Sequence, residues 1–420
     1  MNSQIQSEPG TGEKAFVLLV LLLSLGAFQN LMVTRAAQSP NLAMPKMQGL
    51  WSFLYLVTLL LYSRRCESPI RGLFTVSPLM AVIVFTFASV LWSQDPALTA
   101  RRSIALALTV VFGVYFALRF KPKEQFRLLA WAFLICIIFS FIFELFGLNY
   151  QMGSGWYGIF FIKVHLGRNM ALGALIFLFW EKVESKHSAV ARVGLVASIV
   201  LVALSRDVTS WIVLTVMLIL LPYLQWTLRR SIRWALGGIG FLLALGTFSV
   251  MYVWTHLDTF TAFLGKDPLL TGRVPLWILS TVMAMRRPWL GYGFDAFWLP
   301  DEGAVQRIWH ILRWEPPHAH NGILELWLEI GLIGTALFLI VFVYYVTRAL
   351  RMLRSSSEAT AAWPLMFLLF LFLANLTESV FLGTNSICSI LYVAAATTLS
   401  LKQSEARVGG RFAVPQASYA

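Results

Sequence analysis

The sequence RLLAWAFLICIIFSFIFELFG at residues 127–147 decides the fold class of this chain. Its only charged side chains are Arg127, at the first position, and Glu144, close to the end. A helix that crosses the hydrocarbon core of a bilayer needs roughly 20 mostly apolar residues. In lipid, a helix also satisfies its backbone hydrogen bonds internally. The segment therefore predicts a membrane-spanning helix, with Glu144 inside it.

Apolar segments of this kind recur along the whole chain of 420 residues. Hydrophobic residues make up 58% of the chain and charged residues 13%, and the mean hydropathy is +0.72. Soluble domains carry about a quarter charged residues. We therefore predict an all-α polytopic membrane protein with about 12 transmembrane helices. The predicted segments are 15–34, 48–63, 77–93, 103–120, 127–147, 168–181, 190–205, 209–224, 233–254, 321–347, 362–376 and 385–401, of which 168–181 and 190–205 could be tilted or partly re-entrant.

The basic residues predict the orientation of these helices. If the N-terminus is cytoplasmic, most Lys and Arg residues fall in the inner connections and the C-terminal tail, as the positive-inside rule requires. Both ends are then inside. We predict a single membrane domain over residues 1–420: helices 1–9 in 15–254, a large outer loop at 255–320, helices 10–12 in 321–401 and a cytoplasmic tail at 402–420.

The net charge of +13 does not indicate nucleic-acid binding. The basic residues lie in short inner connections, where they set topology and meet anionic lipid headgroups. The 3 cysteines have no metal-binding or redox spacing. The stretch before residue 15 lacks the basic region and the cleavage site of a signal peptide, so the first helix is expected to remain.

A long polar excursion between residues 272 and 334 is where chemistry is expected. It gathers histidines, arginines, tryptophans and carboxylates on the predicted outer side of an otherwise apolar chain. Its distinctive residues are Gly272-Arg273, Trp277, Pro288-Trp289-Leu290-Gly291-Tyr292-Gly293, Phe297, His318-Ala319-His320-Asn321, Glu325, Glu329, Gly331 and Gly334.

Arginines near the outer helix ends suggest an anion-binding site. Arg168, Arg206 and Arg273 would lose free energy facing lipid, so they should face the protein interior or an aqueous cavity. A guanidinium group there suits a phosphate or a diphosphate, because it donates paired charge-assisted hydrogen bonds. Arg206 could instead form a local pair with Asp207.

Arg273 has a second feature that favours an anion. It precedes an amphipathic run over 274–285, and the N-terminus of such a helix presents free amides to the same ligand. The alternative is a structural ion pair of Arg273 with Asp267 or Asp295.

His320 is the candidate general base. Moving a sugar from a diphosphate to a hydroxyl needs a base for the hydroxyl proton and cations for the charge on the leaving group. Alternatively, His320 caps the next helix or joins an interfacial hydrogen-bond network. His318 is predicted to be structural, and no metal site is expected, because rings at i and i+2 diverge in a helical segment.

Three further residues are expected to support the site. Glu325 and Glu329 are four residues apart and share a helix face. One of them could orient His320 or bind sugar hydroxyls, although Glu325 could equally stabilise the first turn of the helix. Asn321 follows His320 directly and is expected to take part in the same site.

The order of these motifs resembles the O-antigen ligase and polymerase superfamily, which comprises membrane glycosyltransferases of the Wzy and WaaL types. The resemblance rests on the run from Gly272-Arg273 to Gly334. A narrower resemblance, to ExoQ-type exopolysaccharide polymerases, rests on residues 89–120, with Trp92-Ser93-Gln94-Asp95-Pro96 and Arg101-Arg102-Ser103.

The resemblance implies a substrate and roles for two residues. Oligosaccharides carried on undecaprenyl diphosphate would be transferred at the periplasmic face of a bacterial inner membrane, without a metal or another cofactor. The family's loop histidine corresponds to His320, and the arginine of its Gly-Arg motif corresponds to Arg273, which would hold the diphosphate. Membrane lipid and a chain-length-regulating copolymerase are the other expected partners.

The chain departs from the family pattern at the second diphosphate arginine. Where many ExoQ-type proteins carry Ser-x-Ser-x-Thr, this chain has Asp207 at the second serine and Arg206 beside it. Where many carry His-Lys-Asn, it has Gly167-Arg168-Asn169. The second arginine could therefore be Arg168 or Arg206.

Three functions are consistent with the sequence. The first is a polymerase that joins lipid-linked repeat units into exopolysaccharide or O-antigen, which the resemblance over 89–120 favours. The second is a ligase of the same fold that transfers a finished glycan to lipid A core. The third is a transporter or flippase of lipid-linked sugars, which is disfavoured because only Glu144 lies well inside a predicted helix.

Overall fold

The computed structural model describes residues 8–28, 44–66, 68–148, 155–227, 233–234, 237–238, 240–241, 273–300, 302–356, 358 and 360–412. Within these ranges all regular secondary structure is helical. The predicted helix at 233–254 and the first part of the predicted loop, up to residue 272, lie outside the described residues apart from scattered positions.

The other predicted segments each coincide with a helix. Five helices are long and apolar enough to cross a membrane: Pro96–Arg119, Pro122–Leu145, Ser185–Ser205, Val208–Trp226 and Gly322–Ser355. The helices of the bundle are α1 (Thr11–Ser24), α3 (Met44–Arg65), α4 (Pro69–Phe74), α5 (Ser77–Ala88), η2 (Ser89–Leu91), α6 (Pro96–Arg119), α7 (Pro122–Leu145), α8 (Lys163–Val183), η3 (Ser185–His187), α9 (Ser188–Ser205), α10 (Val208–Thr227), α15 (Gly322–Ser355), α16 (Trp363–Ala374) and α17 (Ile387–Phe412).

Three details of the helices correct or refine the predicted segments. Within the described residues, α1 ends at Ser24, and a turn through Gly26 at φ 73° follows, so segment 15–34 is shorter as a helix than predicted. Segments 168–181 and 190–205 are continuous helices, α8 and α9, that lie side by side. The expected helix at 274–285 is α13 (Arg273–Arg286), and a second helix that was not expected, α14 (Gly303–Leu312), follows it.

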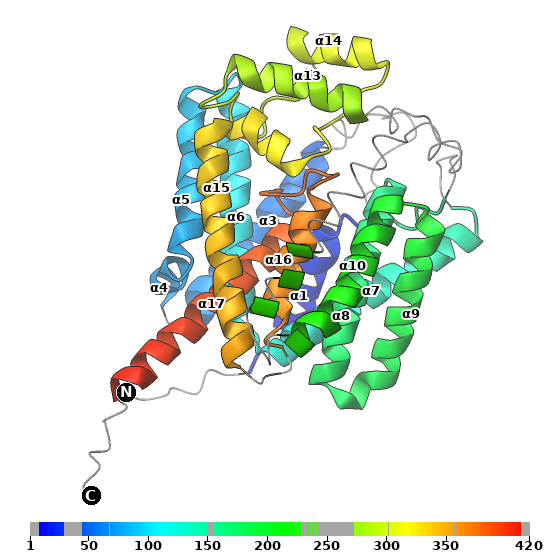
Figure 1. The fold of residues 1–420 in the computed structure, drawn as a ribbon, viewed down its shortest axis with the longest axis vertical. Coiled ribbons are helices and arrows are strands. Elements are labelled where there is room, and N and C mark those ends of the chain that lie inside the picture. The colour runs from blue at the N-terminus through cyan, green and yellow to red at the C-terminus, as the bar shows by residue number, and fades with distance from the viewer. Residues whose placement is uncertain are drawn as a thin grey trace, which may run out of the picture.

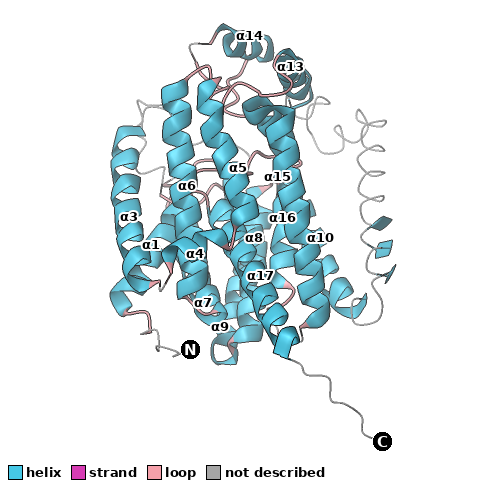
Figure 2. Ribbon diagram, turned by 90° about the vertical axis from the view of Figure 1, so that its left-hand side faces the viewer, coloured by secondary structure: helices cyan, strands magenta, loops and turns pink. Residues whose placement is uncertain are grey.

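The long helices form a bundle, and α13 and α14 run across one of its ends (Figure 1, Figure 2). We call this the site end. At the other end Glu13, in the first turn of α1, contacts Arg119, the last residue of α6. Lys402 of α17 also pairs there with Glu358, which follows α15. The first and last described helices thus have their outer termini at the end opposite α13 and α14.

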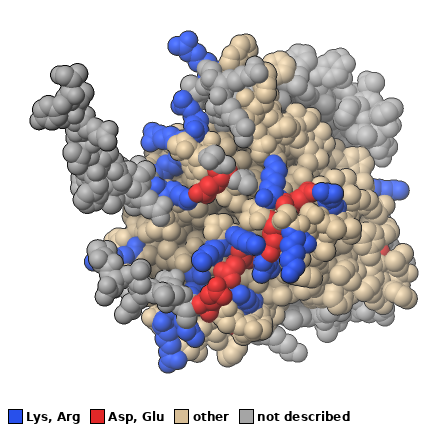
Figure 3. Space-filling model, turned by 90° about the horizontal axis from the view of Figure 1, so that it is seen from below, with Lys and Arg blue, Asp and Glu red and all other residues tan. Residues whose placement is uncertain are grey.

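The opposite end of the bundle carries most of the basic residues, and we call it the basic end. Figure 3 shows Lys and Arg side chains gathered over this face, with Asp and Glu side chains between some of them. Such an accumulation is expected of a cytoplasmic face. Its described residues include Lys14, Arg64, Arg65, Arg71, Lys121, Lys123, Arg127, Lys182, Lys186, Arg192, Arg351, Arg354 and Lys402.

The interior of the bundle is filled by large aromatic side chains, among them the fully buried Trp180, Phe112 and Phe177. Small residues allow helices to approach closely where these rings are absent. A Cβ atom on Gly113 of α6 would lie 2.6 Å from the Cβ of Val393 of α17. Side-chain packing of this kind holds helices together in lipid, where burial of apolar surface contributes little.

A kink interrupts α15 and shapes the site end. Gly331 has φ 67° and ψ −178°, so the helix is broken there. The carbonyl groups of Leu328 and Glu329, which the kink frees, accept hydrogen bonds from the N–H groups of Tyr292 (2.8 Å) and Gly293 (2.9 Å). The segment after α13 therefore supplies the donors that the interrupted helix lacks.

The glycines of this motif are explained by close backbone contact. The N–H of Leu332 donates to the carbonyl of Pro288 at 2.8 Å, on the other side of the kink. A Cβ atom on Gly331 would lie 2.2 Å from the carbonyl oxygen of Trp289, and one on Gly291 would lie 2.6 Å from the backbone nitrogen of Gly331. Both glycines also have positive φ, which other residues adopt at a cost.

The turn at residues 92–96 fixes the same segment to the bundle. Asp95 caps α6 by accepting a hydrogen bond from a backbone N–H in its first turn. The N–H of Gln94 donates to the carbonyl of Tyr292 at 3.0 Å, and Nε1 of Trp92 donates to the carbonyl of Leu290 at 2.8 Å. Two motifs that are far apart in the sequence thus form one structural unit.

Candidate active site

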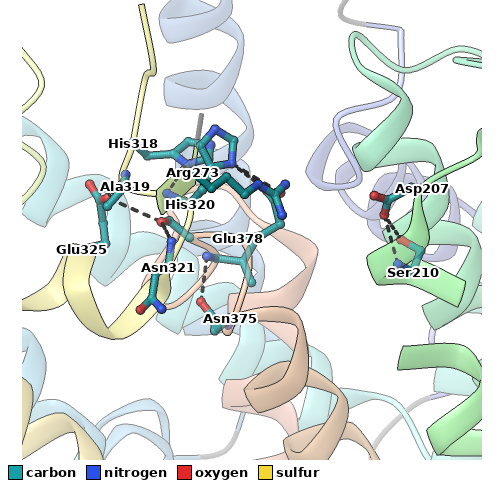
Figure 4. A network of polar contacts seen from close by, with 12 residues as sticks. Asp207, Ser210, Arg273, His318, Ala319, His320, Asn321, Glu325, Asn375 and Glu378 are labelled. Atoms are coloured by element: carbon teal, nitrogen blue, oxygen red, sulfur yellow. Dashed lines mark hydrogen bonds and ion pairs between the residues drawn. The ribbon is translucent and has the colours of Figure 1, made fainter. Parts of the chain in front are cut away.

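A buried carboxylate joins the two residues on which the predicted chemistry rests. Glu378 lies in the connection between α16 and α17 and is 3% exposed. Nη2 of Arg273, at the start of α13, donates to it at 2.7 Å, and Nδ1 of His320 lies 3.3 Å from it (Figure 4). The predicted arginine and histidine are therefore brought together.

Sequence reasoning missed Glu378. The available signal was that this carboxylate lies in the predicted connection between segments 362–376 and 385–401, on the same side of the membrane as the loop at 255–320. The sequence also allowed a structural ion pair of Arg273 with Asp267 or Asp295, but the partner of Arg273 is Glu378. Asp295 pairs with Arg102 at 3.0 Å, and Asp267 lies outside the described residues.

Glu378 is ionised and orients the histidine. Burial would raise the pKa of its carboxyl group, but the hydrogen bond from His320 and the positive charge of Arg273 outweigh burial and lower the pKa to about 2. A carboxylate that faces Nδ1 favours a proton on that nitrogen. The other ring nitrogen, Nε2, is then free to accept a proton.

The two histidines lie against each other. Residues 318–320 are not helical, and His320 has φ 49°. The ring centroids of His318 and His320 are 4.1 Å apart, and Nδ1 of His318 accepts a hydrogen bond from the N–H of His320 at 3.2 Å. The expectation of diverging rings assumed a helical segment and is wrong. Burial, followed by the charge of His320, lowers the pKa of His318 to about 3, so this ring is neutral.

Three donors of the site have the spacing of a metal-ligand set. One ligand atom each from His318, His320 and Glu378 lies within 4.8 Å of the others. Two imidazoles and a carboxylate are a common zinc set. However, the guanidinium group of Arg273 lies 2.7 Å from the same carboxylate, and its positive charge opposes a divalent cation there. Metal independence stays a prediction.

Glu325 holds the histidine segment in place. Its carboxylate accepts hydrogen bonds from the N–H of Ala319 at 2.5 Å, from Nε1 of Trp298 at 2.9 Å and from the hydroxyl of Ser379 at 3.4 Å. Ala319 lies between the two histidines, so this carboxylate fixes the backbone that carries them. Its role is support of the segment, and within the described residues none of these hydrogen bonds involves the ring of His320.

Asn321 caps α15, which removes the capping role considered for His320. Its Oδ1 accepts hydrogen bonds from the N–H groups of Ile323 (3.1 Å) and Leu324 (3.0 Å). Its own N–H donates to the hydroxyl of Ser379 at 3.2 Å. This cap sets the direction in which the chain leaves His320 and enters the helix.

Glu329 lies one turn further along α15, at the kink. It is buried, and its carbonyl group accepts the hydrogen bond from Gly293. Its position therefore belongs to the brace between α15 and residues 288–293. Among the described residues, no hydrogen bond or ion pair joins Glu329 to the cluster around Glu378.

A small pocket identifies which second arginine shares the site. Arg168 of α8, Asp207 and Ser210 line it together with Glu378. Nε of Arg168 is buried and has no hydrogen-bond partner within the described part of the chain. Arg206 is exposed between α9 and α10, with φ 52°, and does not line this pocket. The structure thus brings Arg168, rather than Arg206, to Glu378.

Asp207 has local partners rather than Arg206. Its carboxylate accepts hydrogen bonds from the N–H of Ser210 at 3.1 Å and from its hydroxyl at 2.5 Å (Figure 4). These bonds satisfy a free amide in the first turn of α10. The expected pair between Arg206 and Asp207 is not among the ion pairs of the described residues.

Glu144 lies near the end of its helix. It is one residue from the end of α7, at the site end. Its Oε1 accepts hydrogen bonds from the N–H groups of Tyr157 (2.5 Å) and Gly158 (2.7 Å). The carboxylate lies within a helix, as predicted, and it ties the connection between α7 and α8 to the bundle.

The fold and this site define a polytopic membrane protein with an Arg–Glu–His cluster at one end of the bundle. A family profile described as O-Antigen ligase matches residues 193–339, which include α13, α14 and the kink of α15. The predicted resemblance is thereby confirmed: residues 193–339 of this membrane protein are similar to the O-antigen ligase family.

Individual relatives agree with this family. The chain is 28% identical over 280 residues to "Exopolysaccharide production protein ExoQ" of Rhizobium meliloti (strain 1021), and the alignment covers 63% of each protein, less than two thirds of that relative's length. Two proteins described as "Putative polysaccharide ligase" are also similar. The one from Rickettsia prowazekii is 24% identical over 320 residues, covering 64% of this chain and 78% of its own. The one from Rickettsia felis is 25% identical over 308 residues, covering 60% and 74%.

Proposed function

We propose that this protein is a polysaccharide polymerase that joins oligosaccharide repeat units carried on undecaprenyl diphosphate. The reaction would take place at the periplasmic face of a bacterial inner membrane. The observation that carries the proposal is the meeting of Arg273 and His320 on one buried carboxylate, Glu378, at the end of the bundle opposite the basic face. The likeness to ExoQ supports a role in exopolysaccharide production.

The proton transfer follows from the geometry of His320. Glu378 holds the Nδ1 side of the ring, which leaves Nε2 to accept the proton of the acceptor hydroxyl. The hydroxyl oxygen then attacks the anomeric carbon of the donor. The bond between that carbon and the diphosphate oxygen breaks, and undecaprenyl diphosphate leaves with the bonding electrons.

The charge on the leaving diphosphate would be stabilised by Arg273 and Arg168. Arg273 gives one hydrogen bond to Glu378, while its side chain is 20% exposed, so further N–H groups of the guanidinium can reach a ligand. The buried Nε of Arg168, which lacks a described partner, is a second donor, in a pocket that Glu378 also lines. Two cations at the growing negative charge lower the barrier to departure.

Ligation of a finished glycan to lipid A core is the second candidate. The matching family is described as O-Antigen ligase, and two of the relatives are described as polysaccharide ligases. The same donor site would serve both reactions, because they differ only in the acceptor. A transporter or flippase is disfavoured, since Glu144 binds a connection at the helix end and does not line a path through the bundle.

Deleting the gene and analysing lipid-linked and surface glycans would separate these functions. A polymerase mutant accumulates single repeat units on the carrier lipid, and a ligase mutant accumulates long lipid-linked polymer. Unflipped intermediates on the cytoplasmic side would indicate a flippase. Either of the last two outcomes would overturn the polymerase assignment. A chain-length-regulating copolymerase remains an expected partner of the polymerase.

The role of His320 can be tested in the same strain. His320→Ala should lower the rate of chain growth by about 10²–10⁴-fold, the usual contribution of a general base. Glu378→Gln keeps the ring but loses its ionised partner, so it should show a smaller loss. His310→Ala, on the exposed side of α14, is the matched control and should retain activity. Normal polymer from correctly inserted His320→Ala would remove His320 from the reaction.

A further inference from the structure

Helix α13 exposes an apolar face. Ile278, Val282 and Met285 follow one another at spacings of four and three residues, so they lie on one side of the helix. They are 60%, 48% and 65% exposed. The opposite side already packs against the site-end core through Leu276 and Met283. The helix therefore has two apolar sides, and among the described residues only one of them is covered by protein.

This exposed face continues onto the side of the bundle. Trp289, just after α13, is 64% exposed, and its carbonyl accepts a hydrogen bond from the N–H of Ile333. Ile333 and Leu332 are themselves exposed apolar residues of α15, a helix long and apolar enough to span a membrane. The chain that follows α13 is thus bonded to α15 at a point where both expose apolar side chains.

Two arginines stand at the C-terminal end of this surface. Arg286 and Arg287 are both exposed, and the guanidinium group of Arg287 lies over the ring of Tyr292, with its central carbon 4.8 Å from the ring centroid. Such stacking pre-orders the planar guanidinium, and its remaining N–H groups suit a phosphate. An apolar helix face that ends in arginines and a tryptophan is typical of helices at the membrane interface.

We infer that α13 is an interfacial helix. Its exposed apolar face inserts into the lipid leaflet at the site end, and Arg286 with Arg287 binds the phosphate of an anionic phospholipid. The helix runs across the end of the bundle rather than along it (Figure 1, Figure 2), as an interfacial helix must. This inference concerns membrane contact and does not depend on which glycan reaction takes place.

The inference has a consequence for the other end of the same helix. A helix of 14 residues is about 21 Å long at 1.5 Å per residue. Because α13 lies across the bundle, Arg273 at its first position and Arg286 at its last would lie near the same depth. Lipid contact along α13 therefore holds Arg273 at the level of lipid phosphates, which is where the diphosphate of a lipid-linked donor arrives.

Helix α14 provides an internal contrast. It is also amphipathic, and it buries Val305 and Ile308 in the same core. Its exposed side includes the polar residues Gln306, Arg307 and His310, with Ile311 as an exposed apolar residue beside them. The two helices share a core but differ in their outward faces, so only α13 is expected in lipid.

The depth of the two helices can be measured in the full-length protein. Single cysteines at Val282→Cys and Gln306→Cys would carry a nitroxide label, with Cys66, Cys136 and Cys388 buried. In vesicles of phosphatidylglycerol and phosphatidylethanolamine, the label on α13 should be relaxed by oxygen, and the label on α14 by a water-soluble nickel chelate. Nickel access to both labels, or shielding of residue 282 from both reagents by a second copy or another protein, would overturn the inference.

A second measurement tests the phosphate site directly. Native mass spectrometry would give the apparent affinity for phosphatidylglycerol of the wild type and of the double variant Arg286→Gln, Arg287→Gln. Loss of two basic residues at the surface should weaken binding roughly 30-fold. Arg307→Gln on α14 is the matched control and should bind as the wild type does. Equal affinity in the double variant would show that this arginine pair does not bind lipid phosphate.

Discussion

Two buried arginine–glutamate pairs, one at each end of the bundle, differ in how many hydrogen-bond donors of the arginine remain available to a ligand. At the basic end, Nε and Nη2 of Arg119 donate to the two carboxylate oxygens of Glu13 at 2.8 and 3.1 Å, and the hydroxyl of Tyr115 adds a bond at 2.6 Å. The side chain of Arg119 is 2% exposed. At the site end, Arg273 gives Glu378 one hydrogen bond and is 20% exposed.

The difference separates a structural ion pair from one that can take part in binding. A buried pair is stable only when most of its donors and acceptors are satisfied within the protein. The pair at the basic end meets that condition. The pair at the site end keeps donors of Arg273 near a pocket and shares its carboxylate with His320, so it can accept a charged ligand without first being broken.

The largest expected effect comes from breaking each pair in turn. Arg273→Gln should reduce glycan transfer by about 10²–10³-fold, as loss of one donor to a developing anion does, with a smaller loss of thermal stability than Arg119→Gln, because Glu378 keeps its contact with His320. Arg119→Gln should leave Glu13 buried and unpaired, at a cost of about 3–5 kcal/mol. The folded fraction of that variant should keep its specific activity. Thermal unfolding in detergent and activity per folded protein measure the two effects.

The reverse pattern would contradict the comparison. If Arg273→Gln unfolds the protein and Arg119→Gln folds normally but is inactive, the pair at the site end is structural. Arg273→Lys is the matched variant, since it keeps the charge and loses the planar pair of donors. It should recover stability more fully than activity.

A smaller effect is expected from the two arginines between which the sequence could not decide. Arg168→Gln should weaken binding of the lipid-linked donor roughly 10- to 100-fold, because a charge-assisted hydrogen bond contributes about 1.5–3 kcal/mol. Arg206→Gln should change it less than about fivefold, since Arg206 is exposed and outside the pocket. Donor titrations of the transfer reaction give both values. Equal losses would place Arg206 at the site as well.

The helices and the outline of the site could be predicted from the sequence, because apolar length and residue type carry that information. Residues 127–147 predict a helix in a bilayer, and α7 confirms that helix. The choice of Arg273 and His320 depended on the family motif rather than on spacing. Their contact is made through a third residue, which no local pattern relates to either of them.

The role of Glu378 and the different roles of Glu325 and Glu329 could not be predicted from the sequence, for a physical reason. Their partners come from elements that are distant in the chain and meet only after the helices pack. Glu325 and Glu329 share a helix face, yet one fixes the backbone at Ala319 and the other lies at the Gly331 kink. Both residues precede the kink at Gly331 and still share a helix face, so their different roles come from the different segments that pack against them.

The smallest expected effect concerns the neutral histidine beside the base. Burial and the charge of His320 lower the pKa of His318 from 6.5 to about 3. Between these values the unfolded chain binds a proton at residue 318 that the folded protein does not. Stability should therefore fall as the pH falls through this range, by at most about 1.4 kcal/mol per pH unit from this group.

His318→Asn should flatten that dependence, and the difference in slope between this variant and the wild type from pH 6.5 to 4.5 reports the contribution of His318. The pKa of Glu378 is lowered from 4.5 to about 2, so this carboxylate contributes stability above pH 4.5 that is lost only as the pH falls further toward 2. The exposed His310→Asn controls for removal of a histidine from the surface. Thermal unfolding of the three proteins across this range measures the slopes. If the stability of His318→Asn depends on pH as steeply as that of the wild type, the folded protein does not hold the ring of His318 neutral. The two histidines of the site then do not differ in pKa as the structure implies.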